Sequence, residues 1–379
     1  MDKINLLIVA TIITSVISLL LIFFLLTVKT KDKTSNILFA VFLFINAIDA
    51  SEPFFALISD GPSNLGIFRT TFAFFQIPVF YLYVLSVSYS DFRFKPQYLL
   101  HAVPFLIVNA ALVPRFYAVD AAAKMDFIVN RRNMIELQFI HVLIHLQIIV
   151  YFAAIFMLLK KAKKLYVENN AGTHINSYNW LFQFTTLLSI LYVVAIVKNI
   201  FKFSEYPDIS EWIKVGIQVL QPFIICWYLF KALNNPDLFR NIDSKLKLVK
   251  DIVSEEKVNA STAVNEEVYN GELLKLQQYM SEEKPFLNPS LTIQDVSKGI
   301  KIPVRDLSLL INHKLEQHFY DFVNTYRIEN AMDILKDDTK SKVTILEILY
   351  EVGFNSKSSF NTAFKKHTGN TPTSYRKQF

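Results

Sequence analysis

Amide, carboxylate and imidazole side chains interrupt two of the apolar stretches of this sequence. They form two groups with helical spacing: Asn46, Asp49 and Glu52, and Gln138, His141 and His145. Because residues three or four positions apart lie on one face of a helix, each group can present a polar surface. Such a surface can line a pocket that binds a small ligand or takes up protons. It can equally bond neighbouring helices together, and for any single residue this second role is favoured.

The residues of enzyme active sites do not occur here in the required patterns. His141 and His145 are four positions apart and could share a metal ion, but no glutamate lies between them as in zinc proteases. Cys226 is the only cysteine, which excludes an intramolecular disulfide and a multi-cysteine zinc site. The sequence shows no glycine-rich phosphate loop and no nucleophile elbow. We therefore expect no metal, no cofactor and no enzymatic activity.

Both polar groups lie within long apolar stretches. A helix that crosses a bilayer needs about 20 apolar residues. Seven stretches reach that length: 4–28, 36–58, 67–89, 98–119, 134–159, 178–201 and 211–233. The first is too long for the core of a signal peptide and has no small-residue cleavage pattern, so we count it as a span. Residues 1–235 are therefore predicted to form a seven-helix domain in a lipid bilayer.

Charged residues inside such a domain are costly and indicate a function. Asp49 and Glu52 are the carboxylates of the second span, and Pro53 after them is expected to kink the helix. Arg69 begins the third span and is expected to neutralise Glu52.

The distribution of Lys and Arg predicts how the domain is oriented. The alternate loops 29–35, 91–97 and 160–177 carry nine Lys or Arg in 32 residues. The loops on the other side, 59–66, 114–133 and 198–210, carry six in 41 residues. Because positive charge favours the cytoplasmic side, we expect the N-terminus outside and the chain from residue 234 onward in the cytoplasm.

Residues 236–270 are predicted to join this domain to the rest of the chain. Five apolar residues recur there at steps of three and four: Phe239, Ile242, Leu246, Val249 and Val253. This heptad-like stripe predicts a helix over 239–253 that pairs two protomers as a homodimer and transmits motion. Alternatively, the helix lies on the membrane or on its own domain. Residues 254–267 are polar and have the composition of a flexible linker.

Residues 271–379 have the pattern of a helical domain. We expect helices at 271–281, 291–299, 303–313, 318–335, 343–352, 356–367 and 371–377. Two pieces, 292–311 and 344–364, each contain a short helix, a tight turn and a second helix. A long helix within 319–336 would hold these two pieces about one turn of DNA apart, so that each second helix fits the major groove. Double-stranded DNA is therefore an expected partner.

The end of the chain is similar to a known family. EVGF followed by NSKSSFNTAFKKHTGNTPTSYR resembles the C-terminal signature of AraC/XylS-type transcription regulators. The matching residues are Gly353, Phe354, Ser356, Phe360, Phe364, Lys365, Lys366, Gly369, Thr371, Pro372, Tyr375 and Arg376, with Tyr326, Arg327, Ile328 and Ala331 upstream. The resemblance covers about 100 residues and none of the first 235. It implies a bacterial transcription regulator that binds DNA through two helix-turn-helix motifs.

The first motif departs from the family pattern. Lys301 stands where a glycine is usual in the turn, and Glu316 replaces the glycine common before the long helix. Pro303 occupies the position of a capping serine, a mild change because proline can begin a helix. In the second motif, Leu349 stands at a position that is usually small. By resemblance, the first motif would face the DNA groove with Arg305, Ser308 and Asn312, and Leu309 beside them could contact a thymine methyl group.

The second motif can be read from its own residues. Gly353 permits the backbone angle of the turn, and Ser356 stands where a helix N-cap belongs. Phe354, Phe360 and Phe364 would form a small core. The residues expected to face away from that core and toward bases are Lys357, Ser358, Asn361 and Thr362. Those expected to contact phosphates are Lys365, Lys366 and Arg376.

Charge is unevenly distributed along residues 271–379. The whole segment has 15 Lys or Arg against 13 Asp or Glu, but residues 352–379 have five basic residues and no acid. A solvated basic tail is the simpler explanation, but phenylalanines at helical spacing among the charges argue for a folded DNA-binding motif.

The sequence thus predicts an all-α protein in three parts. A seven-helix sensor domain (1–235) in the bacterial cytoplasmic membrane is joined by 236–270 to a cytoplasmic double helix-turn-helix domain (271–379) that regulates transcription in response to an unknown small-molecule or protein signal. Two alternatives remain: a transporter or channel with a regulatory tail, and a C-terminal domain that binds a protein partner instead of DNA.

Overall fold

The computed structural model describes residues 3–28, 33–58, 61–89, 91–130, 133–171, 175–233 and 266–379. These residues are mostly helical and form no β-sheet, so the all-α prediction is confirmed. Two compact units are present: a bundle unit (Met1–Leu159 with Asn179–Asn241) and a C-terminal unit (Lys160–Tyr178 with Ile242–Phe379). The predicted pairing helix at 239–253 lies outside the described residues.

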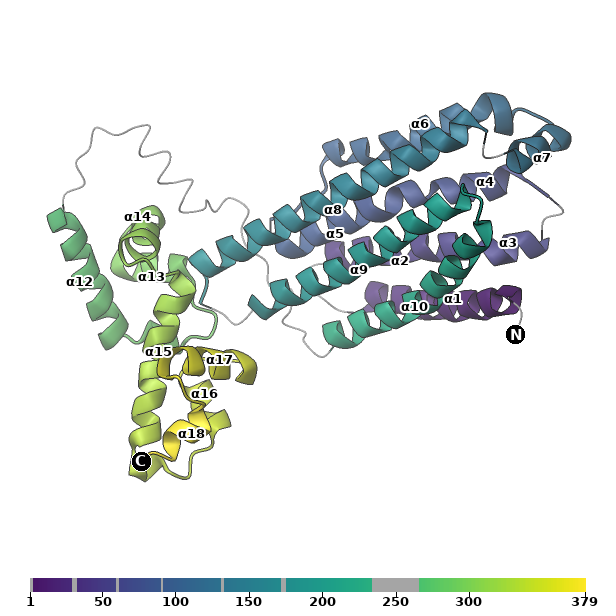
Figure 1. Cartoon of the computed structure of the whole chain (residues 1–379). Helices are drawn as coiled ribbons and strands as arrows, with labels where there is room; N and C mark the ends of the chain where they lie inside the picture. The colour runs from purple at the N-terminus through teal and green to yellow at the C-terminus, as the bar shows by residue number, and fades with distance from the viewer. Residues whose placement is uncertain are drawn as a thin grey trace. The chain divides into compact units, whose positions relative to one another are not determined.

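The bundle unit consists of long helices with short connections (Figure 1). Its elements are α1 (Lys3–Thr27), α2 (Lys33–Ala50), α3 (Glu52–Ile58), α4 (Asn64–Thr71), α5 (Ala73–Ser88), η1 (Pro96–Ala102), α6 (Val103–Leu112), η2 (Val113–Tyr117), α7 (Ala121–Val129), α8 (Ile135–Asn169, whose last ten residues belong to the C-terminal unit), α9 (Ile175–Lys202) and α10 (Pro207–Leu233). Seven segments of the described chain are long and apolar enough to cross a membrane: Asn5–Thr27, Lys33–Ala50, Asn64–Ser88, Pro96–Tyr117, Ile135–Asn169, Tyr178–Lys202 and Pro207–Tyr228. Each overlaps one predicted span.

Two predicted boundaries differ from the structure. The second span is broken at Ser51, where α2 ends and the short α3 begins. Pro53 lies in the first turn of α3, where its missing N–H costs nothing, so the interruption comes just before the proline. The fifth span was expected to end at residue 159, but α8 continues to Asn169. The sequence after 159 is rich in Lys, Ala and Leu, which are strong helix formers, and contains no Gly or Pro.

Aromatic side chains form the centre of the bundle. Phe39, Phe80 and Phe184 are almost completely buried. The ring centroids of Phe39 and Tyr228 lie 4.3 Å apart, and the hydroxyl groups of Tyr83 and Tyr228 hydrogen-bond to each other. Ring packing therefore holds α2, α5, α9 and α10 together, which accounts for much of the abundant phenylalanine of this chain.

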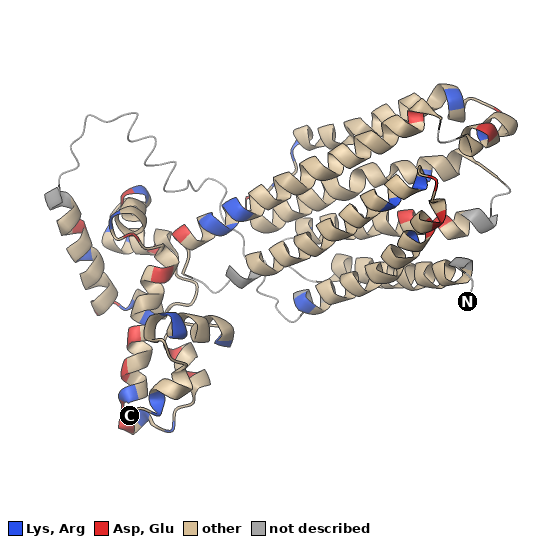
Figure 2. Cartoon of the chain, in the orientation of Figure 1, with Lys and Arg blue, Asp and Glu red and all other residues tan. Residues whose placement is uncertain are grey.

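The outer faces of the bundle are apolar. Leu20, Phe23, Val150 and Phe223 are among the large side chains exposed there. Charged residues are sparse along the length of the helices and gather near their ends (Figure 2). A surface of this kind suits a lipid environment, because apolar side chains are unfavourable in contact with water and compatible with lipid tails.

Amide side chains cross-link the helices inside the bundle. The Gln218 Nε2 group of α10 donates to Thr11 Oγ1 of α1 at 2.7 Å and to the Ala50 carbonyl of α2 at 3.1 Å. Gln221 Nε2 donates to Asn46 Oδ1 at 3.3 Å. These bonds fix α10 against α1 and α2 without any buried charge.

The C-terminal unit carries two small cores on one long helix. Its elements are α12 (Glu266–Glu282), η4 (Pro285–Leu287), α13 (Ile293–Ile300), α14 (Val304–Leu309), η5 (Leu310–Lys314), α15 (Phe319–Lys336), η6 (Asp338–Lys340), α16 (Ile345–Glu351), α17 (Lys357–Thr368) and α18 (Pro372–Arg376). The first part of α15 supplies Phe319, Phe322 and Val323 to the first core. Its second part supplies Ile328, Ala331 and Leu335 to the second core. The helix α15 is thus the connector that the sequence predicts.

Capping residues set where these short helices begin. Thr292 and Thr344 each form a capping box with an acidic residue three positions later. The Ser356 hydroxyl accepts a hydrogen bond from a backbone N–H in the first turn of α17, as predicted. Thr371 caps α18 in the same way, and Pro372 is the first residue of that helix. Both helix-turn-helix motifs are therefore fixed by local bonds as well as by their cores.

The backbone of the first motif keeps the family geometry without the family glycines. Lys301 has φ of 58° and Glu316 has φ of 52°, both in the left-handed region. A residue with a Cβ atom pays about 1–2 kcal/mol for this conformation. The turns are therefore held by the packing around them rather than by the preference of the residue in the turn.

In the second motif, Gly353 adopts φ of 89°. A Cβ atom at this position would lie 2.5 Å from the carbonyl oxygen of Phe286 and 2.8 Å from that of Leu287. Glycine is required here for two reasons, the left-handed backbone and the close approach of the η4 segment.

We therefore expect Gly353→Ala to lower the free energy of unfolding by at least about 2 kcal/mol. Gly271→Ala is the matched control, because Gly271 lies in α12 with no atom within 4 Å of the added Cβ, and alanine in a helix is worth up to about 1 kcal/mol relative to glycine. Denaturant unfolding of the purified chain, followed by circular dichroism, measures both. Equal stability of the two variants would contradict the proposed role of Gly353.

Candidate DNA-binding surface and bundle cavity

The helix α17 has a core face and a polar face. Phe360 and Phe364 are fully buried in the second core, as predicted. The predicted base-contacting residues are exposed or half-buried on the remaining surface: Lys357, Ser358, Asn361 and Thr362. Lys365 is exposed toward the end of the same helix. The layout agrees with the sequence, and DNA contact by these residues stays a prediction.

Two of the predicted phosphate-contacting residues have surroundings that the sequence did not indicate. Lys366 Nζ lies 2.8 Å from a carboxylate oxygen of Asp321 in α15 and is therefore engaged in an ion pair. Arg376 in α18 is half-buried, and its Nε and Nη2 atoms are buried with no hydrogen-bond partner among the residues described. Of the three, Lys365 is the most available to a phosphate.

The recognition helix of the first motif comprises α14 and η5. Leu307, Leu310 and Ile311 pack into the first core, and the predicted base contacts lie on the opposite side of the helix. Ser308 and Leu309 are only 3% and 4% exposed. Arg305 is the exception, with 56% of its side chain exposed. The predicted base-contacting face of α14 and η5 is therefore largely covered in this structure.

The end of α8 and the residues after it lie against this part of the C-terminal unit. Asn312 Nδ2 donates to the backbone carbonyl of Glu168 at 3.2 Å. Asn170 forms an antiparallel bridge with Thr292, and the Ala171 N–H donates to the carbonyl before Thr292 at 3.0 Å. Ala171 is itself completely buried in the first core. Residues 168–171 thus form a docked segment that engages the predicted base-contacting residue Asn312.

The docked segment was not predictable from the apolar pattern. That pattern ends at residue 159 and predicts a loop over 160–177. The run KKAKKL from residue 160, with no Gly or Pro before residue 172, could have indicated a longer helix, but no local pattern points to Asn312 as the partner.

A buried arginine holds the docked segment and the first motif together. Arg327 of α15 is completely buried. It donates to the carbonyls of Phe286 at 2.7 Å, Ala171 at 2.7 Å and Asn288 at 2.8 Å, and its guanidinium lies 5.4 Å from the ring centre of Phe354. Burial lowers the pKa of Arg327 to about 10, which still leaves it charged at neutral pH. The sequence showed this arginine as part of the family pattern but not its role.

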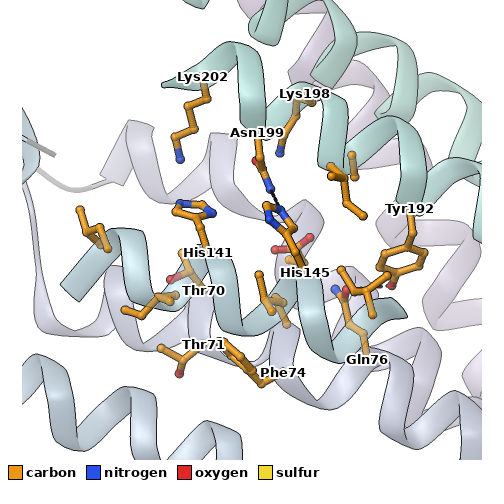
Figure 3. Close-up of a pocket in the computed structure, with 18 of the residues that line it drawn as sticks. Thr70, Thr71, Phe74, Gln76, His141, His145, Tyr192, Lys198, Asn199 and Lys202 are labelled. Atoms are coloured by element: carbon orange, nitrogen blue, oxygen red, sulfur yellow. Dashed lines mark hydrogen bonds between the residues drawn. The ribbon is translucent and has the colours of Figure 1, made fainter. Parts of the chain in front are cut away.

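The bundle unit contains a cavity of about 430 Å³. Three of the six predicted pocket residues line it: Asp49, His141 and His145. Gln76, Tyr192, Lys198, Asn199 and Lys202 complete its polar wall, and Figure 3 shows Lys198, Asn199 and Lys202 of α9 pointing toward the two histidines of α8. Asn199 Nδ2 lies 3.1 Å from His145 Nε2, and the Tyr192 hydroxyl donates to Gln76 Oε1 at 2.9 Å.

The other three predicted pocket residues do not line this cavity. Asn46 bonds to Gln221 and so joins two helices. Glu52 forms an ion pair with Lys214 at 2.9 Å. Gln138 lies one turn before His141 in α8 but is not part of the wall. The helix-bonding interpretation thus fits Asn46, and the pocket interpretation fits Asp49 and the histidines.

Arg69 is one of the cations whose charge acts on Glu52, as expected, but it forms no direct ion pair with that carboxylate. Arg69 Nη1 donates to the carbonyls of Ile48 and Asp49, each at 2.9 Å. These carbonyls stand at the end of α2, where the regular helical hydrogen bonds stop; Ile48 O also accepts from the Ser51 hydroxyl at 2.6 Å, and the guanidinium binds both carbonyls at once. Glu52 is left to Lys214 from the first turns of α10.

Three findings from known proteins bear on the C-terminal unit. A helix-turn-helix domain family matches residues 296–378. The melibiose operon regulatory protein of Escherichia coli is 30% identical over 105 residues, which are 27% of this chain and 34% of that protein. The transcriptional regulatory protein YesN of Bacillus subtilis is 31% identical over 93 residues, 24% of this chain and 25% of its own.

The Msm operon regulatory protein of Streptococcus mutans is 25% identical over 141 residues, 31% of this chain and 50% of its own length. The chain thus matches about a third of the melibiose regulator and half or less of the others. No solved structure matches it significantly. The matched segment coincides with α13 to α18, the two helix-turn-helix motifs and their connector. Residues 296–378 of this chain are a helix-turn-helix domain of the AraC type.

Proposed function

We propose that this chain is a membrane-anchored transcription regulator that binds specific DNA sequences. The observation that carries the proposal is the presence, in one chain, of an AraC-type double helix-turn-helix and seven helices apolar enough to span a membrane. The similar proteins support the regulatory role, since they include two operon regulatory proteins. The bundle senses a signal, and the C-terminal unit converts it into altered transcription.

The second motif supplies the exposed DNA-reading surface. Side chains of α17 can reach base edges through Lys357, Ser358 and Thr362, and Lys365 can neutralise a phosphate. In the first motif, Arg305 is exposed and can contact DNA in the arrangement seen here. The other predicted contacts of this motif become accessible only when residues 168–171 leave the face that carries Asn312. DNA binding and docking of this segment are therefore in competition.

The signal travels along α8. Residues 135–159 of this helix belong to the bundle unit and residues 160–169 to the C-terminal unit, so one continuous helix belongs to both. A shift of α8 would pull on the bonds at Asn312, Thr292 and Arg327. Dimerisation through 239–253 remains a second route, with the same consequence for DNA binding.

Lys365→Gln should weaken binding of the full-length protein to all DNA sequences by a similar factor, because a phosphate contact carries no sequence information. The slope of log K against log salt should fall by about 1. Gel shifts with the upstream region of the gene, at several salt concentrations in detergent, measure both effects. Lys275→Gln makes the same charge change in α12, outside the matched domain, and should leave the slope unchanged. An unchanged slope in Lys365→Gln would count against this contact.

Locking the docked segment should inhibit DNA binding. Asn170 and Thr292 face each other in an antiparallel bridge, a geometry that a disulfide can span. In a Cys226→Ser background, Asn170→Cys with Thr292→Cys should bind DNA at least tenfold more weakly when oxidised and recover on reduction. The oxidised Thr292→Cys single variant is the control. Equal affinity in both redox states of the double variant would mean that docking and DNA binding are compatible.

The predicted orientation is tested by reporter fusions in a bacterial host. Alkaline phosphatase fused after residue 379 should be inactive and a fluorescent protein at that point should fluoresce, because seven crossings from an outside N-terminus end in the cytoplasm. Fusions in the connection between α9 and α10 should show the reverse. Active phosphatase at the C-terminus would refute both the orientation and access to DNA.

A further inference from the structure

The bundle cavity lies near one end of the unit, where several helices begin or end. Asp49 is in the last turn of α2, His141 is in the second turn of α8, and Lys198 is in the last turns of α9. Under the predicted orientation this is the outer end, so a solute outside the cell has a short path to it. The cavity volume of about 430 Å³ falls in the range of small-molecule sites.

The polar wall of the cavity is rich in groups that bind an anion. Lys198 and Lys202 each bring an ammonium group, and Figure 3 shows both pointing toward His141 and His145. The Nδ1 atom of His141 is buried and has no hydrogen-bond partner among the described residues. Because an amide nitrogen can only donate, Asn199 donates a hydrogen bond to His145 Nε2, and the hydrogen of that neutral imidazole then lies on Nδ1.

Among the residues that line the cavity, the ammonium groups of Lys198 and Lys202 are accompanied by one carboxylate, that of Asp49. The neighbouring Glu52 is committed to Lys214 at 2.9 Å, and Arg69 to the carbonyls that end α2. An anion that enters the cavity would meet both ammonium groups in surroundings partly shielded from water, where their attraction is stronger than in bulk solvent.

Much of the remaining lining is hydrocarbon. It includes Ile67, Phe74, Leu112, Ile140 and Ile144, with the hydroxyl groups of Thr70 and Thr71 among them. A ligand that fills the cavity therefore has a charged end and a compact apolar body.

We propose that this cavity binds a small organic carboxylate. Its carboxylate lies among Lys198, Lys202 and His141, and its apolar body lies against Phe74 and the isoleucines. That this molecule acts as the signal rests on the proposed function, whereas its binding does not.

The probes are benzoate and hexanoate, each compared with its uncharged amide, benzamide and hexanamide. The full-length protein in detergent should show a saturable rise in Tm with either acid, by about 2–4 °C at tenfold the Kd. The amides have nearly the same shape but no charge and should give little or no rise. The acid–amide comparison uses the unaltered protein and so does not depend on any variant being folded.

Lys198→Gln should abolish the difference between acid and amide. Lys231→Gln is the matched control, because Lys231 is exposed near the end of α10 and outside the cavity. Equal shifts with acids and amides, or no shift with either acid at 10 mM, would overturn the proposal, as would an unchanged acid response in Lys198→Gln.

A gel shift on the same preparation separates this inference from the proposed function. DNA binding without any acid-specific rise in Tm overturns the carboxylate site alone. An acid-specific rise without DNA binding leaves the site in place and overturns the regulatory role.

Discussion

The C-terminal unit depends on satisfying one buried positive charge. Arg327 is completely enclosed, and a guanidinium in that position is tolerable only if its N–H groups all find acceptors. Four acceptors meet most of that need: the backbone carbonyls of Phe286, Asn288 and Ala171, from distant parts of the chain, and the side-chain oxygen of Asn324. Because the Phe286 carbonyl also borders Gly353, the same point joins the two helix-turn-helix motifs. The docked segment is therefore part of the mechanism that keeps the DNA-binding domain in one arrangement.

Features set by neighbours along the chain were predictable from the sequence. Hydropathy located the seven long apolar helices, because the requirement for about 20 apolar residues is local. Ser356, Thr371 and Gly353 identified the ends and the turn of the second motif, since capping and left-handed backbone depend on one or two residues. The three phenylalanines of the second core followed from helical periodicity. Half of the predicted pocket group, Asp49 and the two histidines, followed from the same periodicity.

Features that join residues far apart in the chain were not predictable. Lys198 and Lys202 were counted as loop charges, because nothing local shows that α9 turns them toward α8. The direct ion-pair partner of Glu52 was missed for the same reason, because only the packing of α10 brings Lys214 to this carboxylate. At Lys301 and Glu316 the residue type was a misleading guide to the backbone. Their types argued against tight turns, yet packing enforces left-handed backbone at both.

The amide cross-links of the bundle have a consequence for how such a protein tolerates its surroundings. Gln218, Gln221, Asn46 and Thr11 bind one another through neutral groups that neither gain nor lose protons in the physiological range. Changes in pH and ionic strength therefore act on the charged residues of the cavity and leave these hydrogen bonds unchanged. The bundle unit thus separates a cavity whose charges respond to the surrounding solution from helix-to-helix hydrogen bonds that do not.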